Sequence, residues 1–261
     1  MPARSAASRL PADSPYAQTS FVALYDRVRP KPPKNLVELL VQLTAGRSPR
    51  VVVDLGSGTG LSTVVWAPYA SRVVGVENNP TMLTHARPAA NVAYRQASAD
   101  ATGLKSGSAD IVTCSQSFHW MNARATIAEI ARIMRRGALF AAYDYVLPPI
   151  VDPRLDDAFD TVLDWAGLTP RRPETETYLR NLRRSGWFRW VRSAAMEGRE
   201  TGDAKRIIDL AMSLGAVSAR LGTAKGRRAR EWTRFTRIAS ETLGHARRPF
   251  WWTYQTVLAM K

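Results

Sequence analysis

The sequence predicts an α/β fold, built as a doubly wound, mostly parallel sheet of seven strands whose last strand is antiparallel. Apolar β-branched runs alternate with helical patterns between residues 50 and 146, as in a parallel sheet with helices on both faces. The first run breaks directly into three glycines at alternate positions. Two further strand-like runs, 187–199 and 250–259, complete the count of seven.

Each element follows from a local pattern. Leucines at three- and four-residue steps after two prolines predict a helix that starts near residue 36 and ends before Gly46. Five strands are expected in the first half, at 51–55, 73–77, 92–96, 110–114 and 138–146. Helices are expected between them at 61–70, 80–87 and 122–135. Beyond Pro148 and Pro149 we expect helices at 153–166, 174–184, 203–221 and 226–243, with a Pro- and Arg-rich link at 169–173.

The domain prediction divides one catalytic unit into four segments. Residues 1–49 are expected to form an N-terminal leader and a lid helix, and 50–147 a ligand-binding core. Residues 148–249 are expected to form a helical cap that includes the sixth strand, and 250–261 the last strand of the core sheet. A cap over the strand ends would select the substrate.

Composition bounds the class of protein. The chain has 261 residues, of which 45% are hydrophobic, so it can bury a sizeable core. It has no apolar run of about 18 residues and no signal-peptide pattern, so we expect a cytoplasmic protein without membrane partners. Cys114 is the only cysteine, which excludes an intrachain disulfide and a multi-thiolate metal site, and we expect no metal.

The net charge of +15 raises the possibility of a nucleic-acid partner, because clustered cations gain affinity from counterion release. The densest stretch is 220–248, with nine basic and two acidic residues. However, both halves of the chain carry a similar excess of basic residues. Abundant arginine and alanine also fit a codon bias of a GC-rich gene, so both interpretations stay open.

The glycine turn predicts a ligand site. Residues 51–60 (VVVDLGSGTG) read as a strand that runs into a turn where Gly56, Gly58 and Gly60 can adopt positive φ and approach a bound molecule closely. The next strand ends in Glu77, about twenty residues after the glycines, where an acid can accept hydrogen bonds from ribose hydroxyls. Together these two signals predict a nucleoside site.

Several motifs in order resemble the class I S-adenosylmethionine-dependent methyltransferases, which have a Rossmann-like fold. Within them the chain is similar to the type 11 group, which includes the ubiquinone-pathway and trans-aconitate enzymes. The resemblance covers residues 22–146 and rests on the glycine turn, Glu77, the pair Asp100–Ala101 and the segment 110–120 (DIVTCSQSFHW). It implies S-adenosylmethionine as cofactor and S-adenosylhomocysteine as product. The implied cofactor-binding residues are Asp54, Gly56, Ser57, Gly58, Gly60, Glu77, Asn78, Asp100, Ala101 and Ser115.

The chain also departs from the group. It has ENNPTM at 77–82 where relatives often have Asp-x-Ser-x-x-Met, and RPKPP at 29–33 where many have Arg-Pro-x-Tyr-Pro. The second change removes a tyrosine from the lid region. Contacts of Tyr16, Tyr25 or Arg29 with the cofactor are therefore left open.

Candidate chemistry follows the fourth strand. Methyl transfer is an in-line displacement that needs alignment more than catalytic side chains, but a hydroxyl acceptor would benefit from a base. His119 is the candidate base, with a structural histidine as the alternative. Phe118 and Trp120 are expected to line the acceptor pocket, or else to belong to the core. Asp144 could face the acceptor or stand in solvent.

These observations predict a methyltransferase that acts on a small molecule. One alternative is an RNA methyltransferase that uses the stretch 220–248, although the sequence after the fourth strand lacks the Asp/Asn-Pro-Pro-aromatic pattern of base-amine enzymes. Another alternative is a cofactor-binding protein without catalysis. An NAD-dependent oxidoreductase fits the glycine spacing less well. The acceptor and the oligomeric state are not readable from the sequence.

Overall fold

The computed structural model describes residues 15–44, 48–168 and 175–261, and these form one seven-stranded sheet in the order β3-β2-β1-β4-β5-β7-β6. The strands are β1 Val51–Leu55, β2 Arg72–Glu77, β3 Val92–Gln96, β4 Ala109–Ser115, β5 Met134–Tyr145, β6 Trp190–Gly202 and β7 Arg248–Met260. Neighbours from β3 to β5 pair in parallel, whereas β7 runs antiparallel to both β5 and β6. The predicted fold class is confirmed.

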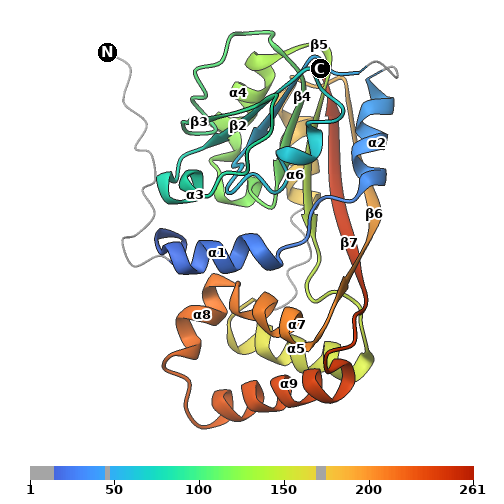
Figure 1. Ribbon diagram of the computed structural model, residues 1–261. Coiled ribbons are helices and arrows are strands. Elements are labelled where there is room, and N and C mark those ends of the chain that lie inside the picture. The colour runs from blue at the N-terminus through green and yellow to red at the C-terminus, as the bar shows by residue number, and fades with distance from the viewer. Residues whose placement is uncertain (1–14, 45–47, 169–174) are drawn as a thin grey trace.

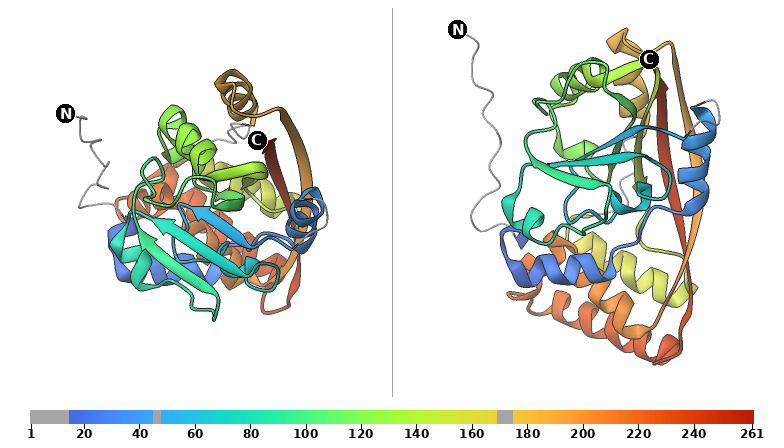
Figure 2. Two further views of the ribbon diagram at one scale, coloured as in Figure 1. Left: turned by 90° about the horizontal axis from the view of Figure 1, so that it is seen from above. Right: turned by 45° about the horizontal axis from the view of Figure 1, so that its top comes forward.

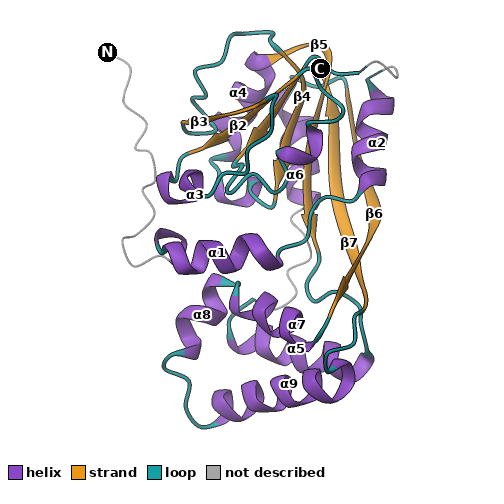
Figure 3. Cartoon of the chain, viewed as in Figure 1, coloured by secondary structure: helices purple, strands orange, loops and turns teal. Residues whose placement is uncertain are grey.

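The helices lie in two groups, one beside the sheet and one below the ends of its strands (Figures 1 and 3). They are α1 Thr19–Val28, α2 Lys34–Leu43, α3 Pro80–Thr84, α4 Ala123–Ile133, α5 Pro153–Trp165, α6 Thr175–Ser185, α7 Ala204–Met212, α8 Gly215–Leu221 and α9 Arg227–Leu243, with short 3-10 turns η1 Pro15–Ala17, η2 Val64–Trp66 and η3 Phe118–Trp120. We call α5, α7, α8 and α9 the cap. Helix α1 lies between the sheet and the cap (Figure 1).

Strand residues alternate between two hydrophobic cores, as the period of two in a strand requires. Along β5, Tyr143 and Tyr145 belong to one core, while Phe140 and Ala142 belong to the other. The first core continues into the cap, where it includes Phe235, and the second contains residues of α4 and α6. The cap therefore shares a core with one face of the sheet.

Strands β6 and β7 connect the sheet to the cap. Each has 13 residues, and they pair from Trp190↔Met260 to Gly202↔Arg248. At roughly 3.3 Å per residue such a ribbon is about 40 Å long. It runs from the sheet down to the cap, and Figure 2 shows the same course from another side.

Several predicted elements differ from the structure. The predicted helix 61–70 is wrong, because these residues form turns around the three-residue η2. Pro68 has no N–H to bond to the Val64 carbonyl, and the β-branched residues before it disfavour a helix. Helix α3 ends at Thr84 rather than at residue 87, shortly before Pro88.

Two differences concern the lid and the cap. The predicted helix 203–221 is two helices, α7 and α8, because the chain bends into an extended conformation at Leu214. Helix α1 was not predicted: the leader was expected to reach residue 20, and no helix was assigned between it and the one near residue 36. The leader up to residue 14 and the predicted link 169–173 lie outside the described residues. The four-segment domain division stays a prediction.

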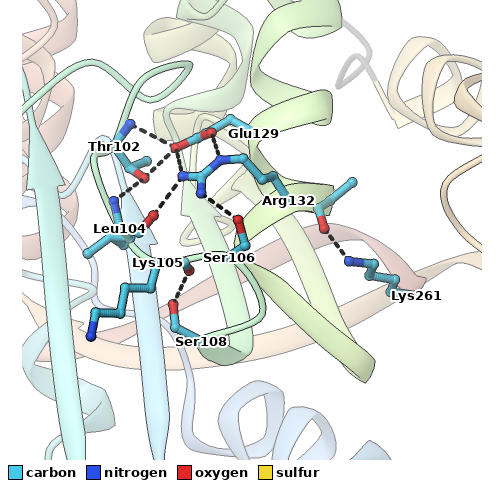
Figure 4. A network of polar contacts seen from close by, with 9 residues as sticks. Thr102, Leu104, Lys105, Ser106, Ser108, Glu129, Arg132 and Lys261 are labelled. Carbon is cyan, nitrogen blue, oxygen red and sulfur yellow. Dashed lines mark hydrogen bonds and ion pairs between the residues drawn. The ribbon is translucent and has the colours of Figure 1, made fainter.

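The loop after β3 is fixed by a carboxylate from α4 (Figure 4). Glu129 accepts hydrogen bonds from the Thr102 backbone N–H at 2.9 Å and from Arg132 at 2.7 Å. Arg132 also donates to the Leu104 carbonyl at 2.8 Å and to the Ser106 hydroxyl at 3.0 Å. The network holds the segment that directly follows Asp100 and Ala101.

Candidate functional site

The glycine turn takes the conformation that the sequence predicts. Gly56, Gly58 and Gly60 have φ of +67°, +55° and +81°, a region that other residues rarely adopt. The Gly56 N–H donates to the Val76 carbonyl at 2.8 Å, which ties the turn to β2. A Cβ on Gly60 would lie 2.0 Å from the Tyr94 hydroxyl oxygen. Gly60 therefore makes room for a protein side chain.

Glu77 lies at the glycine turn, at the end of β2. Its carboxylate accepts the Gly58 N–H at 2.9 Å and the Asn79 N–H at 2.8 Å. Burial raises the pKa of Glu77, and the hydrogen bonds from backbone N–H groups only partly offset that effect. No lysine or arginine among the described residues forms an ion pair with this carboxylate. Glu77 is thus a preorganised acceptor beside the turn, with lone pairs left for further donors.

Two predicted ligand residues point into the protein instead. The Asp54 carboxylate is fully buried and accepts hydroxyl hydrogen bonds from Ser62, Thr63 and Thr113 at 2.6 to 2.7 Å. The Ser57 Oγ lies 2.9 Å from the place where a Cβ on Gly75 would stand, so it faces β2. The Asp54 side chain therefore braces the turn from within, whereas the Ser57 hydroxyl is buried without a hydrogen-bond partner among the described residues. The cofactor contacts of these two residues stay predictions.

The remaining predicted residues near β2 and β3 gather at adjacent strand ends. The Ala97 N–H donates to the Glu77 carbonyl at 3.0 Å, which brings the turn 98–101 beside Glu77. In this turn the Ser98 hydroxyl donates to the Asp100 carboxylate, and the Ala101 N–H donates to the Ser98 carbonyl at 3.1 Å. Asn78 is exposed. An adenine contact through the Ala101 amide would have to replace or share that internal bond.

The end of β4 carries a strained backbone. Ser115 is the last residue of β4, and Gln116 follows with φ of 54°, the one positive φ at a non-glycine residue of the described ranges. The Gln116 N–H donates to the Tyr143 carbonyl at 3.0 Å, which holds this conformation. Such strain concentrates at functional sites. The loop that follows stays tied to the sheet, because the Ser117 hydroxyl donates to the Leu55 carbonyl of β1 at 2.8 Å.

His119 and Asp144 are brought together across β4 and β5. The distance from His119 Nδ1 to Asp144 Oδ1 is 4.0 Å, with both side chains partly exposed. Tyr178 on α6 donates to Asp144 Oδ2 at 3.3 Å. A histidine beside a carboxylate that is itself held in place is an arrangement suited to accept a proton. Tyr178 was not predicted, because only the tertiary fold brings α6 here.

The two aromatic residues beside His119 differ in burial. Phe118 is 2% exposed, with ring centroids 5.6 Å from Phe140 and 4.9 Å from Tyr178, so it belongs to the core. Trp120 is 73% exposed and stands in solvent. Phe118 thus takes the core alternative of the prediction. The acceptor-pocket role of Trp120, whose ring centroid lies 5.0 Å from that of His119, stays a prediction. Cys114 is buried, and burial raises the pKa of its thiol.

Arg29 joins the lid to the sheet and the cap. Directly after α1, its Nε and Nη2 donate to the Ser213 Oγ and carbonyl at 2.9 and 2.8 Å, and its Nη1 donates to the Tyr145 hydroxyl. The guanidinium carbon lies 4.7 Å from the Tyr25 ring centroid. Burial raises the pKa of the Tyr25 hydroxyl. The sequence signal for this hub was only Arg29 before Pro30.

Two searches of the described residues concern membranes and metals. No helix in ranges 15–44, 48–168 and 175–261 is long and apolar enough to cross a membrane. Within the same ranges, no group of three or more His, Cys, Asp or Glu side chains is placed to hold a metal ion.

Comparison with known proteins confirms the family resemblance. Residues 53–142 match the family described as "Methyltransferase domain". The chain is 30% identical over 138 residues to the probable S-adenosylmethionine-dependent methyltransferase CRG1 of Saccharomyces cerevisiae, a match that covers 50% of this chain and 47% of that relative. The chain thus spans about half the length of the curated relatives that it matches.

Solved structures extend the likeness to nearly the whole chain. A putative type II methyltransferase from Anaeromyxobacter dehalogenans superposes with a TM-score of 0.69 at 25% identity, over 88% of this chain and 96% of that one. The [4+2]-cyclase SpnF superposes with a TM-score of 0.50 at 17% identity, over 87% and 80%. The second likeness concerns the fold alone, and shows that the fold also occurs in a protein named as a cyclase.

Proposed function

We propose that this chain, whose residues 53–142 match the family described as "Methyltransferase domain", transfers a methyl group from S-adenosylmethionine to a small-molecule acceptor by in-line displacement. The observation that carries the proposal is the Glu77 carboxylate. It is tied to the glycine turn by the Gly58 N–H at 2.9 Å and has no cationic partner among the described residues. A buried carboxylate without a counter-ion suits a ligand that brings hydroxyl donors of its own.

The residues at the strand ends fit such a cofactor. Glu77 would accept the ribose hydroxyls, and the turn 98–101 with Asp100 would lie along the adenosine. The backbone of Gly56 and Gly58 would border the methionine part. Positive φ gives the turn its shape, and the places that a Cβ would take at these residues lie against Ser117 and Met82 of the protein. Asn78 and Ser115 stand at the ends of β2 and β4, where they border the same space.

His119 and Asp144 would serve the acceptor. S-adenosylmethionine supplies an electrophilic methyl group on a positively charged sulfur. If the acceptor atom carries a proton, His119 would accept it, and Asp144 would orient the imidazole and stabilise its charged form. Tyr178 would hold Asp144 in position through its hydroxyl. Helix α1 and the cap, which cover the strand ends, would exclude water.

The RNA alternative has less support from the charge arrangement. Three arginines on α9 are engaged in ion pairs: Arg227 with Glu231 at 2.6 Å, Arg237 with Glu241 at 2.6 Å and Arg234 with Asp157 at 3.3 Å. These pairs neutralise part of the stretch 220–248. Filter binding of total tRNA tests this alternative, and salt-sensitive retention that Arg228→Gln and Arg230→Gln abolish would favour it over a small molecule.

Two measurements test the proposed function. Isothermal titration of the folded protein with S-adenosylhomocysteine should show binding at a single site, and its absence would contradict the cofactor assignment. Incubation with S-adenosylmethionine and a pool of metabolites should release S-adenosylhomocysteine only when an acceptor is present. Binding without any turnover would favour a protein that uses the cofactor site for something other than methyl transfer.

A further inference from the structure

A charged groove of about 630 Å³ lies between the C-terminal half of α1, the start of α7 and the ends of β6 and β7. This volume is in the range of small-molecule sites. Its lining includes seven basic and four acidic side chains. The groove therefore has an excess of positive charge, and the question is which of its cations are already neutralised.

The four acidic side chains are all engaged with groups of the protein. Asp26 pairs with Arg87 at 2.8 Å. Asp209 receives both Arg27 at 3.0 Å and Lys205 at 2.6 Å. These three pairings account for two of the four carboxylates and leave none of their charge for other cations of the groove.

The other two carboxylates belong to the ends of β6 and α7. Glu200 pairs with Arg206 and also accepts the Lys31 backbone N–H at 3.1 Å. Asp203 caps α7 by accepting the Arg206 backbone N–H at 2.8 Å. Capping of this kind satisfies a helix end and needs no cation nearby.

Three cations of the groove have no carboxylate partner in the described part of the chain: Arg29, Lys31 and Arg247. Arg29 donates only to neutral oxygens of Ser213 and Tyr145. Arg247 donates to the Thr201 carbonyl at 3.2 Å and to its hydroxyl at 3.0 Å. The Lys31 side chain is exposed at the rim. A groove with three such cations suits an anion.

The groove also reaches the candidate cofactor site. Leu61, which directly follows the last glycine of the turn, lines it. Arg29 lines it as well, and its guanidinium contacts Tyr145 at the end of β5. A molecule held by Lys31 and Arg247 at the rim could therefore extend inward along Arg29 toward the strand ends.

We propose that this groove binds the anionic group, a carboxylate or a phosphate, of the methyl acceptor. The acceptor is then an anionic small molecule whose charged end is held by Lys31 and Arg247, with Arg29 at the inner end. That the anion is the methyl acceptor rests on the proposed function, but the anion site itself can be tested without methyl transfer.

The test measures binding of citrate and of inorganic phosphate by isothermal titration, with chloride adjusted to constant ionic strength. The double variant Lys31→Gln/Arg247→Gln should lose about 3- to 30-fold in affinity. This is the combined effect expected when two exposed charges are removed. The matched control Arg183→Gln/Arg184→Gln removes two exposed charges of α6 and should bind as the unaltered protein does. Lys31→Gln alone replaces the double variant if the latter melts early.

The outcomes separate the two proposals. Binding of either anion that the Lys31→Gln/Arg247→Gln variant weakens, and the control variant does not, would support the groove site. Equal losses in both double variants, or no anion binding by the unaltered protein, would overturn the groove proposal while leaving S-adenosylhomocysteine binding intact. Anion binding without S-adenosylhomocysteine binding would instead overturn the proposed function and leave an anion site.

Discussion

Glu77 and Glu129 are two nearly buried glutamates, each 8% exposed, that serve different purposes. Both accept backbone N–H groups, Glu77 at the glycine turn and Glu129 at the loop after β3. Burial would raise the pKa of either one. Arg132 and Thr102 outweigh burial at Glu129 and lower its pKa, whereas the pKa of Glu77 stays raised. The difference fits a structural role for Glu129 and the ligand-binding role that we propose for Glu77.

The largest expected effect concerns His119, which lies on the acceptor side of the proposed site, whereas Glu77 lies on the cofactor side. His119→Ala should lower kcat by about 10²- to 10⁴-fold for an acceptor that loses a proton, because the proton would have no acceptor. Asp144→Asn should cause a smaller loss and change the pH profile. S-adenosylhomocysteine affinity should hold in both variants. His245→Ala, at an exposed position, is the control, and an unaltered kcat in His119→Ala would remove the base role.

A glycine substitution tests whether the turn is part of the fold as well as of the ligand site. Gly60→Ala should lower the free energy of unfolding by about 2–4 kcal/mol, since the new Cβ meets Tyr94 at a φ of +81°. Gly137→Ala is the control, because φ there is +75° with no atom within 4 Å. Denaturant unfolding measures both. Equal losses would mean that φ alone matters and that the Tyr94 contact does not.

Glu77→Gln should separate ligand binding from stability. Loss of hydrogen bonds to a charged acceptor should weaken S-adenosylhomocysteine binding by about 1.5–3 kcal/mol, or roughly 10- to 150-fold. The free energy of unfolding should change by less than about 1 kcal/mol, because the substitution also removes a buried charge. Titration calorimetry measures the first quantity, with Glu38→Gln on the exposed face of α2 as control. Unchanged affinity would show that Glu77 does not hold the cofactor.

Glu129→Gln should give the reverse pattern, with the smallest effect on the ligand. At pH 7 the free energy of unfolding should fall by about 1–2 kcal/mol, while S-adenosylhomocysteine affinity stays within about threefold. Because the folded-state pKa is lowered from 4.5, the contribution of Glu129 is present above that value and is lost as the pH falls through the folded pKa. The variant and the unaltered protein should therefore converge in acid unfolding curves.

A further pH measurement sharpens the contrast, because the pKa of Glu77 is shifted in the opposite direction. Its raised pKa means that the ionised form becomes scarce at a higher pH than for an ordinary glutamate. S-adenosylhomocysteine affinity should therefore decline at mildly acidic pH, and Glu77→Gln should remove that decline. The same decline in both proteins would assign it to another group.

The sequence predicted what backbone and periodicity determine. The strands of the first half, the glycine turn and the place of Glu77 follow from local patterns, and the structure agrees with them. The direction of a side chain in a tight turn does not follow from such patterns. Ser57 faces Gly75, and Asp54 collects three hydroxyls, because β4 and the turn after Gly60 supply partners that the linear sequence does not reveal.

Most of the features that the sequence did not predict are contacts between segments far apart in the chain. Tyr178 reaches Asp144 from 34 residues away, and Arg29 reaches Ser213 across 184 residues. Local periodicity in the sequence does not predict such pairs. Helix α1 was missed although its sequence carries a helical pattern, with Phe21, Leu24, Tyr25 and Val28 at three- and four-residue steps next to a leader rich in Ala, Ser and Pro. Burial of Phe118 and exposure of Trp120 depend on how η3 is oriented.

The long ribbon of β6 and β7 has a consequence for how molecules enter and leave. Both strands run without a break, from Trp190 to Gly202 and from Arg248 to Met260. They therefore form a continuous connection between the sheet and the cap. We therefore expect the cap to stay fixed relative to the sheet. A ligand would then reach the strand ends through a movement of α1, the helix whose following residue, Arg29, binds both the sheet and the cap.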